Sequence, residues 1–138
     1  MRSFALLPIG ASALLLLLLP GTALAAGAVE VNWVNPHGSV VVTTGACHNA
    51  LCGWVRWADA TATADAADAG VAHLAGTELL RDYHARVPGR WAGYVYVPDR
   101  GRSFYSTIEQ LDANRLKISG CLLRGWLCKS QIWTRQQG

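Results

Sequence analysis

The sequence predicts an all-β domain of antiparallel strands, on the evidence of residue type, strand spacing and turn residues. After residue 25 the leucine-rich composition gives way to β-branched and aromatic residues interrupted by Gly, Pro, Asn and Asp. Short apolar runs separated by turn signals such as 35–38, 98–101 and 112–114 are typical of an antiparallel sandwich or barrel. The expected strands lie at 29–34, 39–46, 52–58, 91–97, 103–111, 115–121 and 127–135.

Two stretches depart from this strand pattern. Residues 59–76 are rich in Ala and Asp, which predicts a loop or a short helix packed on the sheet. Residues 77–87 place Leu79, Leu80, Tyr83 and Val87 at helical spacing. A strand there would nevertheless complete a closed barrel, so both alternatives stand on the residues alone.

The first 25 residues predict a secretory signal peptide. Arg2 precedes an apolar run over 4–19, a Pro20-Gly21 break and the small residues of 23–25. A membrane anchor is the rival interpretation, but the run is shorter than the roughly 20 residues of a spanning helix. No cysteine precedes Cys47 to accept a lipid. We therefore expect a single domain over 26–138, periplasmic or secreted and not anchored to a membrane.

The length and charge of the chain limit its size as a domain and the classes of partner that it is expected to bind. Removing residues 1–25 from the 138-residue chain leaves 113, enough for one domain with a modest core. The remaining 11 Lys/Arg and 9 Asp/Glu give a net charge of +2, with both signs spread along the chain. Nucleic-acid binders concentrate basic charge on one face, so nucleic acid is not an expected partner.

All four cysteines lie in the exported part, which predicts two disulfides. A hairpin with the four-residue loop 48–51 would set Cys47 opposite Cys52 and Val42 opposite Trp57. The same register largely separates apolar from polar residues and turns Trp57 inward. At the other end of the chain, a second hairpin would set Cys121 opposite Cys128.

Nothing in the sequence predicts catalysis, a metal or a cofactor. The cysteine spacings do not match the paired C-x-x-C pattern of zinc or redox sites, and paired thiols leave no nucleophile. The histidines are scattered, the Asp residues of 59–68 lack the spacing of a calcium loop, and no serine has a nucleophile-elbow context. We expect a protein that is not an enzyme.

The aromatic residues are the remaining functional signal, because all six tryptophans lie in the exported part. If the sheet closes on itself, inward side chains form either a filled core or a cavity for one small apolar or amphipathic ligand. The candidate ligand-binding residues are Val42, Val55, Trp57, Trp91, Phe104 and Trp133.

The exported part resembles the family of small bacterial proteins designated domain of unknown function 2147. The shared residues run in order over about 36–135. They are Cys47, Leu51-Cys52-Gly53, Trp57, Trp91, Gly93, Tyr96, Pro98, Gly101-Arg102, Leu116, Gly120-Cys121 and Gln131-Ile132-Trp133-Thr134-Arg135. The resemblance implies a lipocalin-like, up-and-down antiparallel β-barrel of about eight strands, with 77–87 as a strand. It supplies no catalytic residues.

Two residues and one stretch depart from the family pattern. Trp33 lacks the glycine of an opening G-x-W, Phe104 replaces a usual tyrosine, and 59–75 matches loosely. We expect a lipocalin-like barrel that binds a small apolar or amphipathic ligand in its cup. The alternative is a packed barrel whose surface binds an envelope protein or the cell wall, for which Trp54 and Trp126, each near a hairpin end, are the expected exposed contacts.

Overall fold

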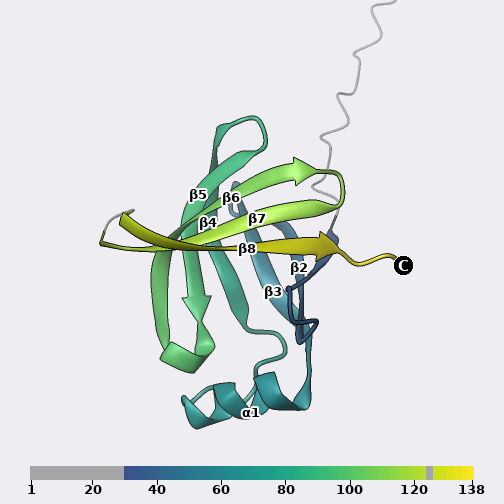
Figure 1. Cartoon of the computed structure of the whole chain (residues 1–138), viewed down its shortest axis with the longest axis vertical. Helices are drawn as coiled ribbons and strands as arrows, with labels where there is room; N and C mark the ends of the chain where they lie inside the picture. The colour runs from purple at the N-terminus through teal and green to yellow at the C-terminus, as the bar shows by residue number, and fades with distance from the viewer. Residues whose placement is uncertain (1–29, 124–125) are drawn as a thin grey trace, which may run out of the picture.

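The computed structural model describes residues 30–123 and 126–138 and shows a closed antiparallel β-barrel (Figure 1). Each strand pairs with the next in the chain, and β8 returns to pair with β1. The elements are β1 (Val31–Val34), β2 (Val40–Cys47), β3 (Ala50–Ala58), α1 (Ala60–Asp68), β4 (Glu78–Val87), β5 (Arg90–Val97), the 3₁₀ helix η1 (Pro98–Arg100), β6 (Arg102–Asp112), β7 (Arg115–Leu122) and β8 (Trp126–Arg135). The predicted fold class is confirmed. The predicted signal peptide lies outside the described residues.

The seam of the barrel is short. Strand β1 meets β8 through Trp33 opposite Arg135 and Val34 opposite Thr134. The backbone N–H of Gln136 extends this pairing by donating to the Asn32 carbonyl over 2.8 Å. The first and last strands of the domain therefore lie side by side, and their pairing closes the sheet.

The uncertain stretch 77–87 is a strand, β4, as the family resemblance implied. Its helical spacing arises because the strand is interrupted: the register with β5 shifts between Arg81 and His84, and Asp82 has a φ of 51°. Leu79, Leu80 and Tyr83 are all buried, whereas a regular strand would bury alternate residues. A β-bulge thus reproduces the apolar spacing of a helix.

Within 59–76 the structure forms a short helix, α1, which lies across one end of the barrel (Figure 1). The helix begins after Asp59, whose side chain accepts a hydrogen bond of 2.8 Å from the Ala62 backbone N–H. Ala66 and, beyond the helix, Leu74 are buried and join the barrel core. In the described part of the chain, no helix is long and apolar enough to cross a membrane.

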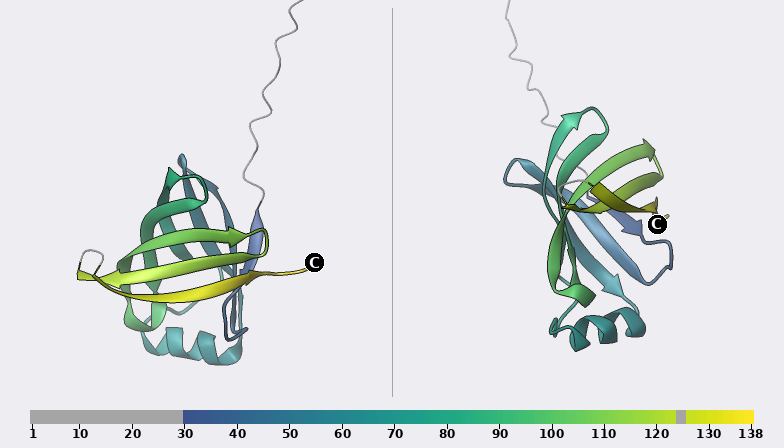
Figure 2. Two further views of the ribbon diagram at one scale, coloured as in Figure 1. Left: turned by 45° about the horizontal axis from the view of Figure 1, so that its top comes forward. Right: turned by 60° about the vertical axis from the view of Figure 1, so that its left-hand side comes forward.

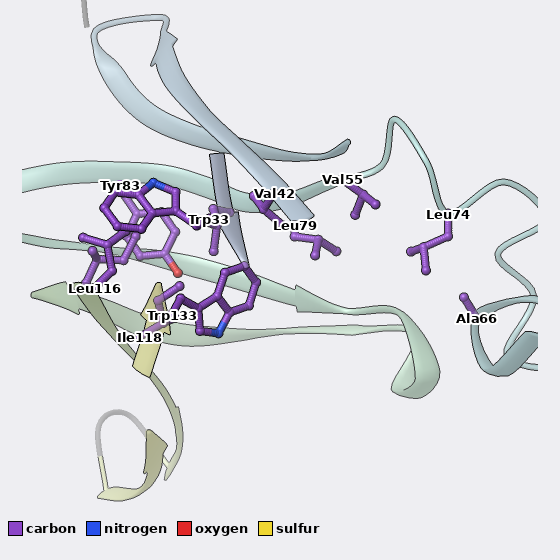
Figure 3. Close-up of a cluster of buried hydrophobic side chains, with 12 residues drawn as sticks. Trp33, Val42, Val55, Ala66, Leu74, Leu79, Tyr83, Leu116, Ile118 and Trp133 are labelled. Carbon is purple, nitrogen blue, oxygen red and sulfur yellow. The ribbon is translucent and has the colours of Figure 1, made fainter. Parts of the chain in front are cut away.

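The interior of the barrel contains large side chains from most of its strands (Figure 3). The most deeply buried are Tyr83, Leu80, Ile108, Val42, Cys52 and Ser106. The Trp33 indole Nε1–H donates to Thr44 Oγ1 over 3.0 Å, so its only polar group is satisfied in the core. The described interior is therefore substantially filled by the protein itself.

Both predicted cysteine pairs are disulfides, Cys47–Cys52 and Cys121–Cys128. The second pair is directly opposed, as predicted, with 4.0 Å between its Cα atoms, and the same register sets Leu116 opposite Trp133.

The predicted register of the first hairpin is wrong. Cys47 lies opposite Ala50 and Cys52 opposite Gly45, so the first disulfide is diagonal, with 5.9 Å between its Cα atoms. The physical reason is the turn: His48 and Asn49 both have positive φ, 41° and 63°. That conformation makes a two-residue hairpin loop, instead of the predicted four-residue one.

Candidate ligand-binding site

Three of the six predicted ligand-binding residues lie deep in the barrel core. Val42 and Val55 face each other across β2 and β3 and are 0% and 2% exposed, and Trp133 is 8% exposed (Figure 3). Trp91 is half-buried and packs against the same core. The structure brings these residues together, but as members of the packed interior.

Trp57 is not inward-facing; its side chain is 49% exposed. Val42 lies opposite Val55 while Val41 lies opposite Trp57, so Arg56 is an extra residue in β3. A bulge of one residue reverses which face the following side chains occupy. Trp57 therefore lies on the outer surface, where it borders a hollow of about 470 Å³ lined by Val34, Gly38, Val41, Arg56, Trp57 and Gln136.

Phe104, like Trp57, borders accessible space, in a second hollow of about 430 Å³. The lining residues come from β5, β6, β7 and the residue after β7: Tyr94, Arg102, Ser103, Phe104, Tyr105, Cys121, Leu122 and Leu123. We call this the rim hollow. It lies where β6 begins and β7 ends.

The rim hollow combines aromatic and leucine side chains with the polar side chains of Arg102 and Ser103. Tyr94 and Tyr105 are exposed, lie opposite each other on β5 and β6, and meet edge to face with ring centroids 6.4 Å apart. The Arg102 guanidinium lies 5.6 Å from the centroid of the Phe104 ring. An arginine held over an aromatic ring keeps its charge available to a ligand while its stem covers apolar surface.

A second cation lies beside the rim hollow. Arg81 of β4 donates to Ser103 Oγ over 3.4 Å, and its guanidinium lies 4.5 Å from the centroid of the Tyr96 ring. The described lining residues of the hollow include no carboxylate. Apolar walls next to arginine suit an amphipathic molecule with an anionic head.

Of the residues that line the rim hollow, the sequence predicted only Phe104 as a ligand-binding residue. Tyr94 and Tyr105 belong to two separate predicted strands, and only the β5–β6 register places them face to face. A usable signal was the neighbouring pair Arg102 and Phe104, which follows the predicted turn 98–101.

The barrel centre contains two fully buried hydroxyl groups, those of Tyr83 and Ser106. They are neighbours, but neither makes a hydrogen bond of good geometry. Burial raises the pKa of the Tyr83 phenol well above its ordinary value of 10.0, and the adjacent Ser106 hydroxyl offsets part of that rise. Tyr83 is therefore a neutral phenol over the physiological pH range.

The raised pKa of Tyr83 predicts a loss of stability at high pH. Below about pH 10 the phenol is protonated in both the folded and unfolded states, so Tyr83 contributes no pH dependence. Above that pH the unfolded chain loses the proton and the folded protein retains it, which favours unfolding. Tyr83→Phe should therefore lose about 2 kcal/mol less free energy of unfolding than wild type between pH 10 and 12. Urea unfolding across this range measures the difference.

The control for this prediction is Tyr105→Phe, which removes an exposed hydroxyl and leaves Tyr83 in place. It should keep the wild-type pH dependence. If the free energy of unfolding of Tyr83→Phe falls between pH 10 and 12 as steeply as that of wild type, the raised pKa of Tyr83 is contradicted.

Among the described residues, the group of three potential metal ligands is Cys47, Cys52 and Glu78, whose ligand atoms lie within 4.8 Å of one another. Both sulfurs belong to the same disulfide, so the group offers no thiolate. The four histidines are exposed and lie in separate segments, at 37, 48, 73 and 84. These residues do not form a ligand set of the kind that structural zinc needs.

The two tryptophans expected to be exposed near hairpin ends differ. Trp126 is 77% exposed, as expected. Trp54 is only half-exposed, because it lies opposite Thr43 and Glu78 on the neighbouring strands and its ring packs over Gly45. Of the two tryptophans predicted to contact a partner, only Trp126 is largely exposed.

Comparison with known proteins places the chain in a family. Neither the curated proteins nor the solved structures provide a match. A family model covers residues 32–135, which include all eight strands except the first residue of β1. The two disulfides are consistent with the extracytoplasmic location that the sequence predicts. The protein belongs to the family described as uncharacterized protein conserved in bacteria (DUF2147).

Proposed function

We propose that this protein is an exported, non-enzymatic barrel that binds a small amphipathic molecule with an anionic head in the rim hollow. The observation that carries the proposal is a space of about 430 Å³ with aromatic and leucine walls and Arg102 at its edge. Ligand pockets are commonly of this size and combine apolar walls with a few polar groups that orient the ligand.

The packing of the barrel supports the rim as the site. Val42, Val55 and Trp133 belong to a core in which Tyr83, Leu80 and Ile108 are almost wholly buried. A ligand that occupied their positions would have to displace packed side chains, which costs several kcal/mol. At the rim, by contrast, Tyr94 and Leu122 are about half exposed and border open space.

The charges at the rim support an anionic head group. The Arg102 guanidinium lies over Phe104, and the Arg81 guanidinium lies over Tyr96 and donates to Ser103. Arg102 lines the hollow and Arg81 adjoins it through Ser103, and guanidinium groups are the side chains best suited to bind a carboxylate, sulfate or phosphate. The apolar tail would then lie against Tyr94, Tyr105 and the leucines.

Dodecanoate is a suitable probe of this site. Isothermal titration should show dodecanoate binding to the wild-type protein and weaker binding, by about tenfold, to Arg102→Gln, because one charge-assisted contact contributes roughly 1.4 kcal/mol. Tyr94→Ser should also weaken binding through loss of apolar contact. Dodecanol, which lacks the charge, should bind wild type and Arg102→Gln equally.

The matched control is Arg56→Gln, which removes an exposed arginine beside the hollow of Trp57. Its affinity for dodecanoate should equal that of wild type. Equal affinities in Arg102→Gln, Arg56→Gln and wild type, or no binding to wild type, would refute the rim hollow as the ligand site.

A further inference from the structure

The β7–β8 hairpin ends in an unusually apolar tip. Leu122, Leu123, Trp126 and Leu127 are 48%, 72%, 77% and 72% exposed. We call these four residues the apolar tip. Exposed loop ends are normally polar, and a group of large exposed apolar side chains marks a binding surface. The hairpin also projects from the barrel (Figures 1 and 2).

Backbone conformation and covalent structure hold the apolar tip in this arrangement. Leu123 and Leu127 have φ values of 51° and 54°, in the left-handed region that leucine rarely adopts. The Cys121–Cys128 disulfide crosses the hairpin directly behind them. Strained residues that persist in a native structure concentrate at functional positions. The disulfide and the backbone conformation therefore hold these apolar side chains in an exposed position.

Basic residues lie on the strands next to the apolar tip. The segments 94–97, 102–105, 120–123 and 126–129 include the tip and the parts of β5, β6 and β7 that line the rim hollow with it; they contain Arg102 and Lys129 and no Asp or Glu. Arg81 lies next to them through its hydrogen bond to Ser103. This surface combines leucines, a tryptophan and basic residues, which is the composition of segments that sit at the interface of an anionic membrane.

We propose that the apolar tip docks the protein onto the surface of an anionic lipid bilayer. Leu123 and Leu127 enter the boundary of the acyl chains, Trp126 lies at the level of the head groups, and Arg102 and Lys129 face the lipid phosphates. Docking of this kind is peripheral and reversible, since the inserted side chains are few.

The test is flotation of the purified protein with vesicles of phosphatidylcholine, with and without phosphatidylglycerol. The wild-type protein should bind the vesicles that contain phosphatidylglycerol, bind neutral vesicles more weakly, and dissociate as salt is raised. Trp126→Ser/Leu127→Ser should reduce the partition coefficient by about tenfold or more, because two large apolar side chains no longer enter the membrane.

The matched control is Trp57→Ser/Leu111→Ser, which removes two other exposed apolar side chains, 49% and 39% exposed, from different parts of the barrel. It should bind vesicles like wild type. Three outcomes would each overturn the proposal: equal binding by the tip variant and wild type, equal binding to neutral and anionic vesicles, or no vesicle binding. The last of these would leave a protein partner as the occupant of the tip.

Membrane docking and ligand binding can be separated experimentally. Trp126 and Leu127 do not line the rim hollow. Dodecanoate binding should therefore persist in Trp126→Ser/Leu127→Ser, and the weaker dodecanoate binding expected of Arg102→Gln tests the hollow independently of the tip.

Discussion

Gly93→Ala should lower the free energy of unfolding by about 3 kcal/mol or more. A Cβ at this position in β5 would lie 2.6 Å from the Arg81 carbonyl oxygen, 2.8 Å from the Asp82 carbonyl oxygen and 2.8 Å from the Tyr83 Cα. All three atoms are backbone, so rotation of a side chain cannot relieve the overlap. The bulge of β4 that buries Tyr83 requires this close approach of the two strands.

Gly120→Ala is the matched control for that change. Its new Cβ would meet only the Val95 side chain, at an ordinary contact distance of 3.5 Å. Thermal unfolding followed by circular dichroism should give a melting temperature near wild type for Gly120→Ala and one lower by 10 °C or more for Gly93→Ala, at roughly 4–8 °C per kcal/mol for a domain of this size. Similar melting temperatures for the two variants would show that β4 and β5 are not so closely packed.

Ile108→Ala is the second change for which we expect a large effect, a loss of about 2–5 kcal/mol. Ile108 is 1% exposed and lies at the centre of β6, opposite Trp91 on β5 and Ile118 on β7. Truncation removes buried apolar contacts and leaves a cavity that neighbouring strands, held in a closed sheet, cannot collapse to fill.

Leu111→Ala provides the comparison on the same strand, because Leu111 is 39% exposed. Urea unfolding should give a loss of less than about 1 kcal/mol for this variant. Comparable losses at the two positions would contradict the packed interior, and with it the argument that a ligand binds at the rim.

The fold was predictable because several local signals agreed. Turn residues at 35–38, 98–101 and 112–114 divide the chain at the positions where the hairpins turn. The even cysteine count and the short intervals at 47–52 and 121–128 indicated two hairpin disulfides. For β4, periodicity alone favoured a helix, and only the family resemblance indicated a strand.

The errors arose from single-residue features that leave no clear trace in the sequence. The extra residue Arg56 in β3 turns Trp57 outward, and the positive φ of His48 and Asn49 shortens a loop and shifts a register. Because side chains alternate at a period of two, one such residue reverses the assignment of every side chain that follows in the strand.

The candidate site was only partly predictable, since it depends on contacts between strands. The sequence predicts Phe104 as a ligand-binding residue, and it lines the rim hollow, but Tyr94, Tyr105 and Leu122 join it only through the pairing of β5, β6 and β7. The packing that fills the interior could not be seen either, because an eight-stranded barrel is compatible with both a filled core and a cavity.

The pairing of β1 with β8 has a consequence during synthesis of the chain. The ribosome makes β1 before, and β8 after, the other strands of the barrel, so β1 and β7 each have an unpaired edge until β8 emerges. An exposed strand edge is a template for pairing with other chains. A sheet that folds before β8 is made therefore exposes two edges to other chains. Delaying formation of the sheet until β8 is made would prevent this aggregation.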